Sequence, residues 1–466
     1  MWSSVERFST QGISFLFTIF LARMLSPSDY GAVAMLSIFM AVSQVFIDSG
    51  FASALIRKKD CSESDYSTVL YFNISVSVGL YVILFISAPL VAEFYKTKVL
   101  TVLLRAMGTT LIFNALCIVQ QAILTAKIDF KTQTKVSILA VTISGIAGLS
   151  TAYLGYGIWA LVVQAVSLSA FRAIFLWLFT KWRPVKHFSG KSFNSLFSYG
   201  SKLLISGLLD TTYSNMYPLV IGKYYTSNQL GSYSRALSLC QFPSSSITGI
   251  IQRVFFPVFS SIQNEDERLK SAYIKCLKLS AFLIFPLMLL VSALSKPLIL
   301  CVLTKKWLPA VPFMEIICFD LMWYPIHAIN LNLLEVKGRS DYFLKLEVIK
   351  KVIGISILIL TLPHGVKAMC WGMVASSLLC LIVNTHYTNK IIHIGFLSQM
   401  RFLLPICANS FVAGAIALSA RCFIEGNLNQ IVIGGCAAIL YYAGINILLK
   451  TQEAEEIISF ARKYNG

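Results

Sequence analysis

The sequence predicts an all-α integral membrane protein with about fourteen transmembrane helices. Its 466 residues are 56% hydrophobic and only 13% charged, with a mean hydropathy of +0.72. Soluble proteins usually have about 25% charged residues. Many apolar runs along the chain reach the length of roughly 20 residues that spans a bilayer. An internal duplication of these apolar spans is the third observation.

The duplication links segments that lie about two hundred residues apart. A turn at 26–31 follows one long apolar span, and a similar turn at 227–231 follows another. The segment 157–160 is likewise echoed by 365–368. Repeated membrane spans are typical of transporters, whose two halves move around a site between them. The pattern therefore favours a transporter over a receptor or a passive anchor.

The apolar spans can be placed in order along the chain, each as one helix. The predicted helices are 3–25, 28–52, 66–92, 99–126, 134–154, 157–180, 192–222, 228–250, 277–295, 308–335, 342–362, 366–389, 402–421 and 428–449. The first is interrupted by charged residues and the ninth is short.

The distribution of basic residues predicts the orientation of these helices. With the amino terminus in the cytoplasm, 26 of the 39 Lys and Arg residues fall on cytoplasmic segments and 9 on outer segments. Cytoplasmic loops of membrane proteins are enriched in Lys and Arg. The bias predicts a multi-pass protein with both termini in the cytoplasm and an even number of spans. No cleavable signal peptide is expected, since Met1–Ser4 lacks a basic start.

Several functional classes are excluded by the same features. The net charge of +18 would suggest nucleic acid in a soluble protein, but here the cations lie mostly between spans. The eleven cysteines show no metal-binding spacing, so neither a disulfide nor a metal site is predicted. The predicted outer loops are too short to fold a catalytic domain, so an enzyme is not expected. In the connection 253–278, residues 264–268 predict a helix start at the membrane surface, and 450–466 predicts a short surface helix.

Polar residues inside the predicted spans gather on one side of four helices. These are the first two helices of each half, and polar groups in lipid are costly and therefore informative. We interpret them as the lining of a water-filled cavity between the halves. The candidate lining residues are Arg7, Gln11, Gln44, Asp48, Lys202, Asp210, Tyr213, Arg235 and Gln241.

Structural alternatives exist for some of these residues. Arg7 lies near a helix end, where snorkelling towards head groups is an equal alternative. Asp210 lies about 12 Å of helix rise from Lys202, too far for a direct ion pair, but it could pair with Arg235. Asp320 is a candidate for binding a coupling proton or sodium ion, although a hydrogen bond to a neighbouring helix is the commoner role. No cofactor is predicted beyond such an ion.

The chemistry of the candidate cavity favours an anionic, sugar-bearing substrate. Inward-facing cations suit phosphate or pyrophosphate. Tyr213 and Gln44 add the hydrogen-bonding surface that sugars need.

Four segments resemble those of bacterial polysaccharide flippases. They are 2–8, 20–31, 48–56 and 231–236. The chain is similar to the Wzx-type O-antigen and exopolysaccharide exporters, including the colanic and teichuronic acid subgroup. These belong to the MATE-like multidrug/oligosaccharidyl-lipid/polysaccharide superfamily.

The resemblance implies an architecture and a substrate. It implies a V-shaped bundle of two pseudo-symmetric six-helix lobes, at 1–180 and 192–390, joined by a cytoplasmic linker at 181–191. Residues 391–466 would add helices thirteen and fourteen and the tail. The implied substrate is an oligosaccharide on undecaprenyl pyrophosphate, moved by alternating access between the leaflets of the bacterial inner membrane. Membrane lipid, a glycan polymerase and a chain-length regulator are the further candidate partners.

Two rival functions share the expected fold. A MATE-type multidrug exporter would need an acidic cavity, whereas the candidates here include the bases Lys202 and Arg235. A lipid II flippase would be indispensable for growth.

Overall fold

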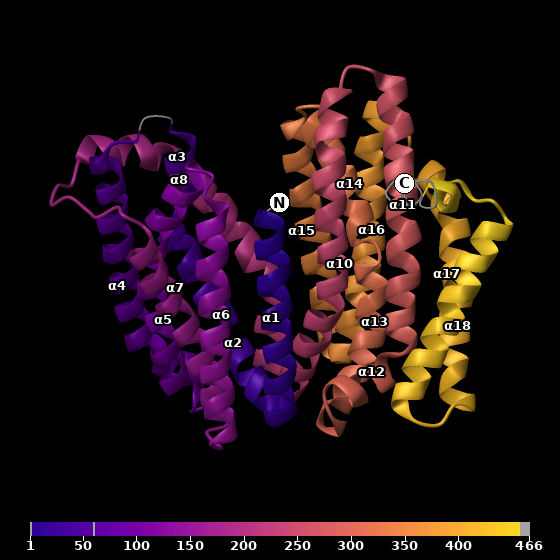
Figure 1. Cartoon of the computed structure of the whole chain (residues 1–466), viewed down its shortest axis with the longest axis horizontal. Coiled ribbons are helices and arrows are strands. Elements are labelled where there is room, and N and C mark those ends of the chain that lie inside the picture. Colours follow the sequence, from indigo (N-terminus) through magenta and orange to yellow (C-terminus); the bar gives the residue numbers. More distant parts are fainter. Residues whose placement is uncertain (1, 59–60, 457–466) are drawn as a thin grey trace. The chain divides into compact units, whose positions relative to one another are not determined.

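The computed structural model describes residues 2–58 and 61–456 (Figure 1). For residues 2–8, 195, 198, 199, 202 and 340, the description is confined to the backbone. The described chain consists of α-helices, two short 3-10 turns and their connections. It divides into two compact units, Met1–Gly231 and Ser232–Gly466, each with its own internal packing.

The N-terminal unit is a bundle in which α1 packs against α6, α6 against α7, and α4 and α7 against α5. The helices α8 and α9 pack against α2, and the short helix α3 packs against α5 and α8. Its helices are α1 (Trp2–Met24), α2 (Pro27–Asp48), α3 (Phe51–Arg57), α4 (Glu63–Phe94), α5 (Leu100–Ala126), α6 (Phe130–Tyr153), α7 (Trp159–Phe179), α8 (Gly190–Ser214), α9 (Met216–Tyr224) and the first turn of α10 (Ser227–Ser261).

The C-terminal unit is a second bundle, in which α11 packs against α13, α14 and α17, and α16 against α13, α14 and α15. The last two helices, α17 and α18, lie side by side (Figure 1). Besides the rest of α10, the elements are α11 (Asp266–Ala293), α12 (Ser295–Val302), η1 (Lys305–Ala310), α13 (Val311–Leu321), α14 (Tyr324–Val336), α15 (Ser340–Thr361), η2 (Leu362–His364), α16 (Val366–Ile392), α17 (Phe396–Phe423) and α18 (Asn427–Leu448).

The two duplicated turns start their helices in the same way. At α2, the Asp29 amide donates to the Ser26 hydroxyl at 3.3 Å, and the Ser26 amide donates to the Asp29 carboxylate at 2.9 Å. At α10, Gln229 and Thr226 exchange the same two bonds at 3.3 and 3.4 Å. Both are capping boxes, in which two otherwise unsatisfied amides are bonded reciprocally. The repeated sequence thus encodes a repeated local structure.

These two helix starts also contact each other through their glycines. A Cβ at Gly31 would meet the carbonyl oxygen of Ser227, and a Cβ at Gly231 would meet the carbonyl oxygen of Pro27. The contact is reciprocal, because each glycine faces the first residue of the other helix. Only glycine lets two backbones approach this closely.

The protein is a multi-pass membrane protein. In the described part of the chain, nine helical segments are long and apolar enough to cross a bilayer. The helices outside this set include α1, α8 and α10, which carry most of the predicted site residues. A helix that lines an aqueous path need not be apolar throughout, so the total of fourteen spans stays a prediction.

Some predicted helices are interrupted or extended in the structure. The predicted helix 28–52 ends at Asp48, since Ser49 and Gly50 adopt left-handed backbone before α3 begins. The predicted helix 192–222 breaks at Asn215, and 308–335 breaks between α13 and α14. The helix start predicted at 264–268 is confirmed, since α11 begins at Asp266, and α11 then continues into a span. Its predicted place at the membrane surface stays a prediction. Of the predicted tail helix, residues 452–456 are helical and 457–466 lie outside the described residues.

The boundary between the compact units differs in position from the predicted linker at 181–191. It falls at Gly231 because α8 and α9, beyond the linker, pack against α2. Packing units and repeat units need not coincide, so the repeat lobes 1–180 and 192–390 and the segment 391–466 remain predictions.

Candidate substrate site

The predicted site residues of α1 and α2 differ in their surroundings. Gln11 is half-buried on α1, whereas the side chain of Arg7 lies outside the described residues. Gln44 accepts a hydrogen bond of 2.9 Å from the Asn114 amide on α5. Hydrogen bonds of this kind join helices within a membrane. Gln44 therefore has a structural partner as well as a predicted role in the cavity.

Asp48 lies at the end of α2, where α8 crosses closely. Its side chain is exposed. A Cβ at Gly200 on α8 would meet the Ser49 carbonyl oxygen, and one at Gly207 would lie 3.1 Å from a Val45 methyl group. The two glycines let α8 run close to α2. This contact brings the backbone of α8 beside Asp48.

The helix α8 carries three predicted site residues. Asp210 is exposed and Tyr213 half-buried, both within its last two turns. The side chain of Lys202 lies outside the described residues. The Asn215 amide donates to the Thr211 carbonyl at 2.9 Å, where α8 gives way to α9. The predicted pairing of Asp210 with Arg235 remains a prediction.

The two predicted site residues of α10 have opposite exposure. Gln241 is exposed, but Arg235 is only 6% exposed. The Arg235 guanidinium lies 5.7 Å from the ring centroid of Trp307, a fully buried side chain. Cation–π contacts of this kind gain strength when they are desolvated. Trp307 was not among the predicted site residues, although it follows Lys305 and Lys306 next to a predicted helix start.

Asp320, the candidate coupling residue, belongs to a chain of hydrogen bonds between α13, α14 and α16. The Ser377 hydroxyl is hydrogen-bonded to the Asp320 carboxylate. The Ser377 oxygen also lies 3.0 Å from Nε2 of His327, and the Asn384 amide nitrogen lies 2.8 Å from Nδ1 of the same ring. Both predicted roles of Asp320, interhelical hydrogen bond and coupling site, stay compatible with this geometry. A histidine inside an apolar span was the signal that could have identified this chain.

The described residues include all eleven cysteines. None of these eleven cysteines forms a disulfide, and the sulfur atoms of Cys240 and Cys318 lie 3.5 Å apart. Within residues 2–58 and 61–456, no group of three or more His, Cys, Asp and Glu side chains could hold a metal ion.

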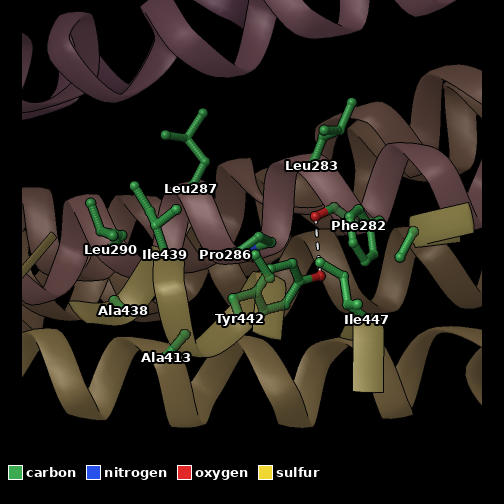
Figure 2. Close-up of a pocket in the computed structure, with 12 residues that line it drawn as sticks. Phe282, Leu283, Pro286, Leu287, Leu290, Ala413, Ala438, Ile439, Tyr442 and Ile447 are labelled. Carbon is green, nitrogen blue, oxygen red and sulfur yellow. Dashed lines mark hydrogen bonds between the residues drawn. The ribbon is translucent and has the colours of Figure 1, made fainter. Parts of the chain in front are cut away.

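An apolar cavity of about 400 Å³ lies between α11, α17 and α18 (Figure 2). Figure 2 shows Leu283, Leu287 and Ile439 around it, with the Tyr442 hydroxyl donating to the Phe282 carbonyl at 3.1 Å. That bond satisfies the hydroxyl, so the cavity presents hydrocarbon surface. Its chemistry suits an acyl or polyprenyl chain.

The architecture is that of a known membrane-protein fold. The chain is similar to the solved structure of the lipid II flippase MurJ in its inward closed conformation, with a TM-score of 0.78 and 16% identity over 96% of this chain and 99% of that one. It is also similar to an inward-facing multidrug resistance MATE family transporter of the MOP superfamily, with a TM-score of 0.61 and 14% identity over 82% and 94% of the two chains. The predicted MATE-like fold is confirmed.

The family follows from the sequence comparison. The polysaccharide biosynthesis protein family matches residues 20–312, more than half of the chain, and the chain belongs to this family. The teichuronic acid biosynthesis protein TuaB of Bacillus subtilis (strain 168) is 24% identical over 469 residues, covering 99% of this chain and 97% of TuaB. The predicted resemblance to polysaccharide exporters is confirmed.

Proposed function

We propose that this protein is a flippase for a polyprenyl-pyrophosphate-linked oligosaccharide in surface polysaccharide assembly. The observation that carries the proposal is the combination of family and fold. A member of the polysaccharide biosynthesis family has, over nearly its whole length, the fold of a lipid II flippase. The substrate would pass from the inner to the outer leaflet of the bacterial inner membrane by alternating access.

The proposal assigns different parts of the substrate to different residues. The cations Arg7, Lys202 and Arg235 would attract the pyrophosphate, because charge-assisted hydrogen bonds to phosphate are strong. The polar residues Gln11, Gln44, Asp48, Asp210, Tyr213 and Gln241 would contact the sugars. The polyprenyl chain would remain in lipid or enter the apolar cavity of Figure 2.

Orientation, energy coupling and partners are further parts of the proposal. The excess of basic residues supports both termini in the cytoplasm. Asp320 would bind a coupling proton or sodium ion, supported by its place in the hydrogen-bonded chain with Ser377 and His327. A glycan polymerase and a chain-length regulator would act on the exported substrate next.

The experiment that tests the function is deletion of the gene in its own host. Lipid-linked oligosaccharides and surface polysaccharide are then measured together. The proposal expects loss of one surface polymer, with its lipid-linked precursor stranded on the cytoplasmic side. Unchanged polymer with increased sensitivity to cationic drugs would support a multidrug exporter instead. Loss of viability would support the lipid II flippase.

Charge reversal of Arg235 tests the site rather than the pathway. Arg235→Glu should abolish export, because it places an anion where pyrophosphate would bind and removes the contact with Trp307. Arg235→Lys keeps the charge and should retain part of the export. Arg268→Glu, on an exposed surface ion pair, is the matched control. Normal export by Arg235→Glu, at normal protein level in the membrane, would remove Arg235 from the site.

A further inference from the structure

A second cavity, with several polar side chains in its lining, lies wholly within the C-terminal unit. Of the residues named in the proposal above, His327 lines it. The cavity has a volume of about 340 Å³ and lies between α10, α14, α15 and α16. Its polar lining comprises Gln252, Tyr324, His327, Asn332, Glu335 and Lys350. Pockets for small ligands usually measure about 300–1,000 Å³. This cavity is at the small end of that range.

Charged groups of both signs lie around the cavity. The Lys350 ammonium lies 2.7 Å from the Glu347 carboxylate, and both side chains are largely buried. The Glu335 carboxylate lines the cavity and is exposed. Two carboxylates beside one ammonium disfavour a phosphate, and the ammonium disfavours a bare cation. The cavity therefore suits an uncharged polar ligand.

Both hydrogen-bond donors and hydrogen-bond acceptors line its walls. The Gln252 amide points to the Asn332 carbonyl oxygen at 3.4 Å, a long bond that a ligand hydroxyl could replace. The Lys350 ammonium donates, and the Glu335 carboxylate accepts. Sugar hydroxyls do both, so they match a wall of this composition.

Aromatic side chains supply the apolar part of the lining. Tyr324 is 45% exposed, and Phe343 is half-buried beside the same cavity. A pyranose ring has hydroxyls at its edge and apolar C–H groups on its faces. Flat aromatic rings next to hydrogen-bonding groups suit both surfaces.

The inner wall is held in place before any ligand arrives. His327 is fixed by Ser377 at 3.0 Å and by Asn384 at 2.8 Å, one bond to each ring nitrogen. Asn384 is fully buried on α16. Binding sites built on rigid helices with a supporting second layer lose little entropy on binding.

We propose that this cavity binds one or two pyranose rings of the lipid-linked oligosaccharide. The inference rests on the proposed flippase function and names the part of the substrate that the C-terminal unit recognises. It makes Asn332 and Tyr324 determinants of sugar specificity, separate from the cations proposed for the pyrophosphate. Part of the sugar head is thereby bound within the C-terminal unit, in addition to the contacts proposed above.

Binding can be measured on the full-length protein in lipid nanodiscs. The probes are the monosaccharides released by hydrolysis of the host's surface polymer, added singly and followed by saturation-transfer NMR. Asn332→Leu and Tyr324→Leu should each weaken binding about three- to tenfold, the effect of losing a hydrogen bond or a ring contact. Tyr324→Phe keeps the ring and should bind within about twofold of the native protein. Asn429→Leu, at an exposed position on α18, is the matched control.

Export measured in the deletion strain separates the two proposals. Suppose that deletion abolishes the polymer, and that both leucine variants are present at normal level and melting temperature. If these variants then bind sugar and export like the native protein, the sugar site is wrong and the flippase function stands. If deletion leaves the polymer intact, the flippase function fails and the sugar site fails with it. Reduced binding and export by both leucine variants, with normal Tyr324→Phe and Asn429→Leu, is the expected result.

Discussion

In the N-terminal unit the closest helix contacts are made by backbone atoms at glycines, whereas in the C-terminal unit buried polar side chains join the helices. Cβ atoms at Gly31, Gly200 and Gly231 would each meet a carbonyl oxygen of another segment. In the C-terminal unit, Tyr273, Asn330, Thr388 and Gln399 connect four helices through one hydrogen-bonded network. The first kind of contact fails when a side chain is enlarged, and the second fails when a polar atom is removed.

The polar contacts of the N-terminal unit are simpler. Gln44 is bonded to Asn114, and the Thr180 hydroxyl is bonded to Gln120. Each joins two helices or their ends. In the C-terminal unit, Arg421 is bonded to both Glu315 and Ser295, which connects α17 with α13 and α12. A network of several partners leaves more buried atoms unsatisfied when one member is lost.

The largest effect on stability is expected at Gly231. In Gly231→Ala the new methyl group meets the Pro27 carbonyl, and neither backbone can move without shifting a helix start. We expect a loss of about 3 kcal/mol in the free energy of unfolding. Thermal unfolding in detergent measures it. Gly435→Ala is the matched control, since nothing lies within 4 Å of its Cβ, and it should be neutral or slightly stabilising. Equal melting temperatures for the two variants would contradict the close contact.

The next effect is expected at Asn330, the centre of the four-helix network. Its side chain accepts from Tyr273 at 2.8 Å and from Thr388 at 2.7 Å, and it donates to the Ile326 carbonyl at 2.8 Å. Asn330→Leu leaves the two hydroxyls without this acceptor, so we expect a loss of roughly 2 kcal/mol. The melting temperature should fall relative to Asn429→Leu. A fall no larger than for the exposed control would show that the network contributes little.

A smaller effect is expected at Gln44 in the N-terminal unit. Gln44→Leu removes one hydrogen bond to Asn114, and single interhelical bonds in membranes contribute about 0.6 kcal/mol on average. The double variant with Asn114→Leu should cost little more, because both partners of one bond are then absent. If the stability lost in the double variant equals the sum of the losses in the two single variants, Gln44 and Asn114 act independently. Reduced export at unchanged stability would instead support the predicted role of Gln44 in the cavity.

An effect of similar size to that at Gln44 is expected at Asp129, the N-cap of α6. Its carboxylate accepts from the Thr132 hydroxyl at 2.7 Å and from the Thr132 amide at 3.1 Å, and these bonds lower the pKa of Asp129. Asp129→Ala should cost about 0.5–1 kcal/mol at pH 7. Because the pKa is lower in the folded state, this contribution is complete above the unfolded pKa of about 3.9 and is lost as the pH falls through the folded value. The free energies of unfolding of the native protein and of Asp129→Ala, measured from pH 7 to pH 3, test this. The difference between them should shrink on acidification, and a difference that grows would contradict the prediction.

Much of the fold follows from the sequence because its signals are local. Apolar runs give the helices, and Ser26 with Asp29 gives a capped helix start. The duplication links that start to the one at Thr226 and Gln229. The breaks at Ser49–Gly50 and at Asn215 were not predicted, since continuous hydropathy masks a change of backbone direction. The predicted site residues share helix faces, but sequence spacing does not say what lies opposite them.

The sequence by itself determined a membrane protein of apolar helices, its repeated capped turns and its kinship with polysaccharide exporters. The tertiary structure decided which polar residues are joined: Arg235 with Trp307, and His327 with Ser377 and Asn384. It also decided that the glycines of the two repeated turns face each other. Helix periodicity extends over a few turns, whereas these partners are 50 to 200 residues apart, and only the packing of the helices brings them within contact distance.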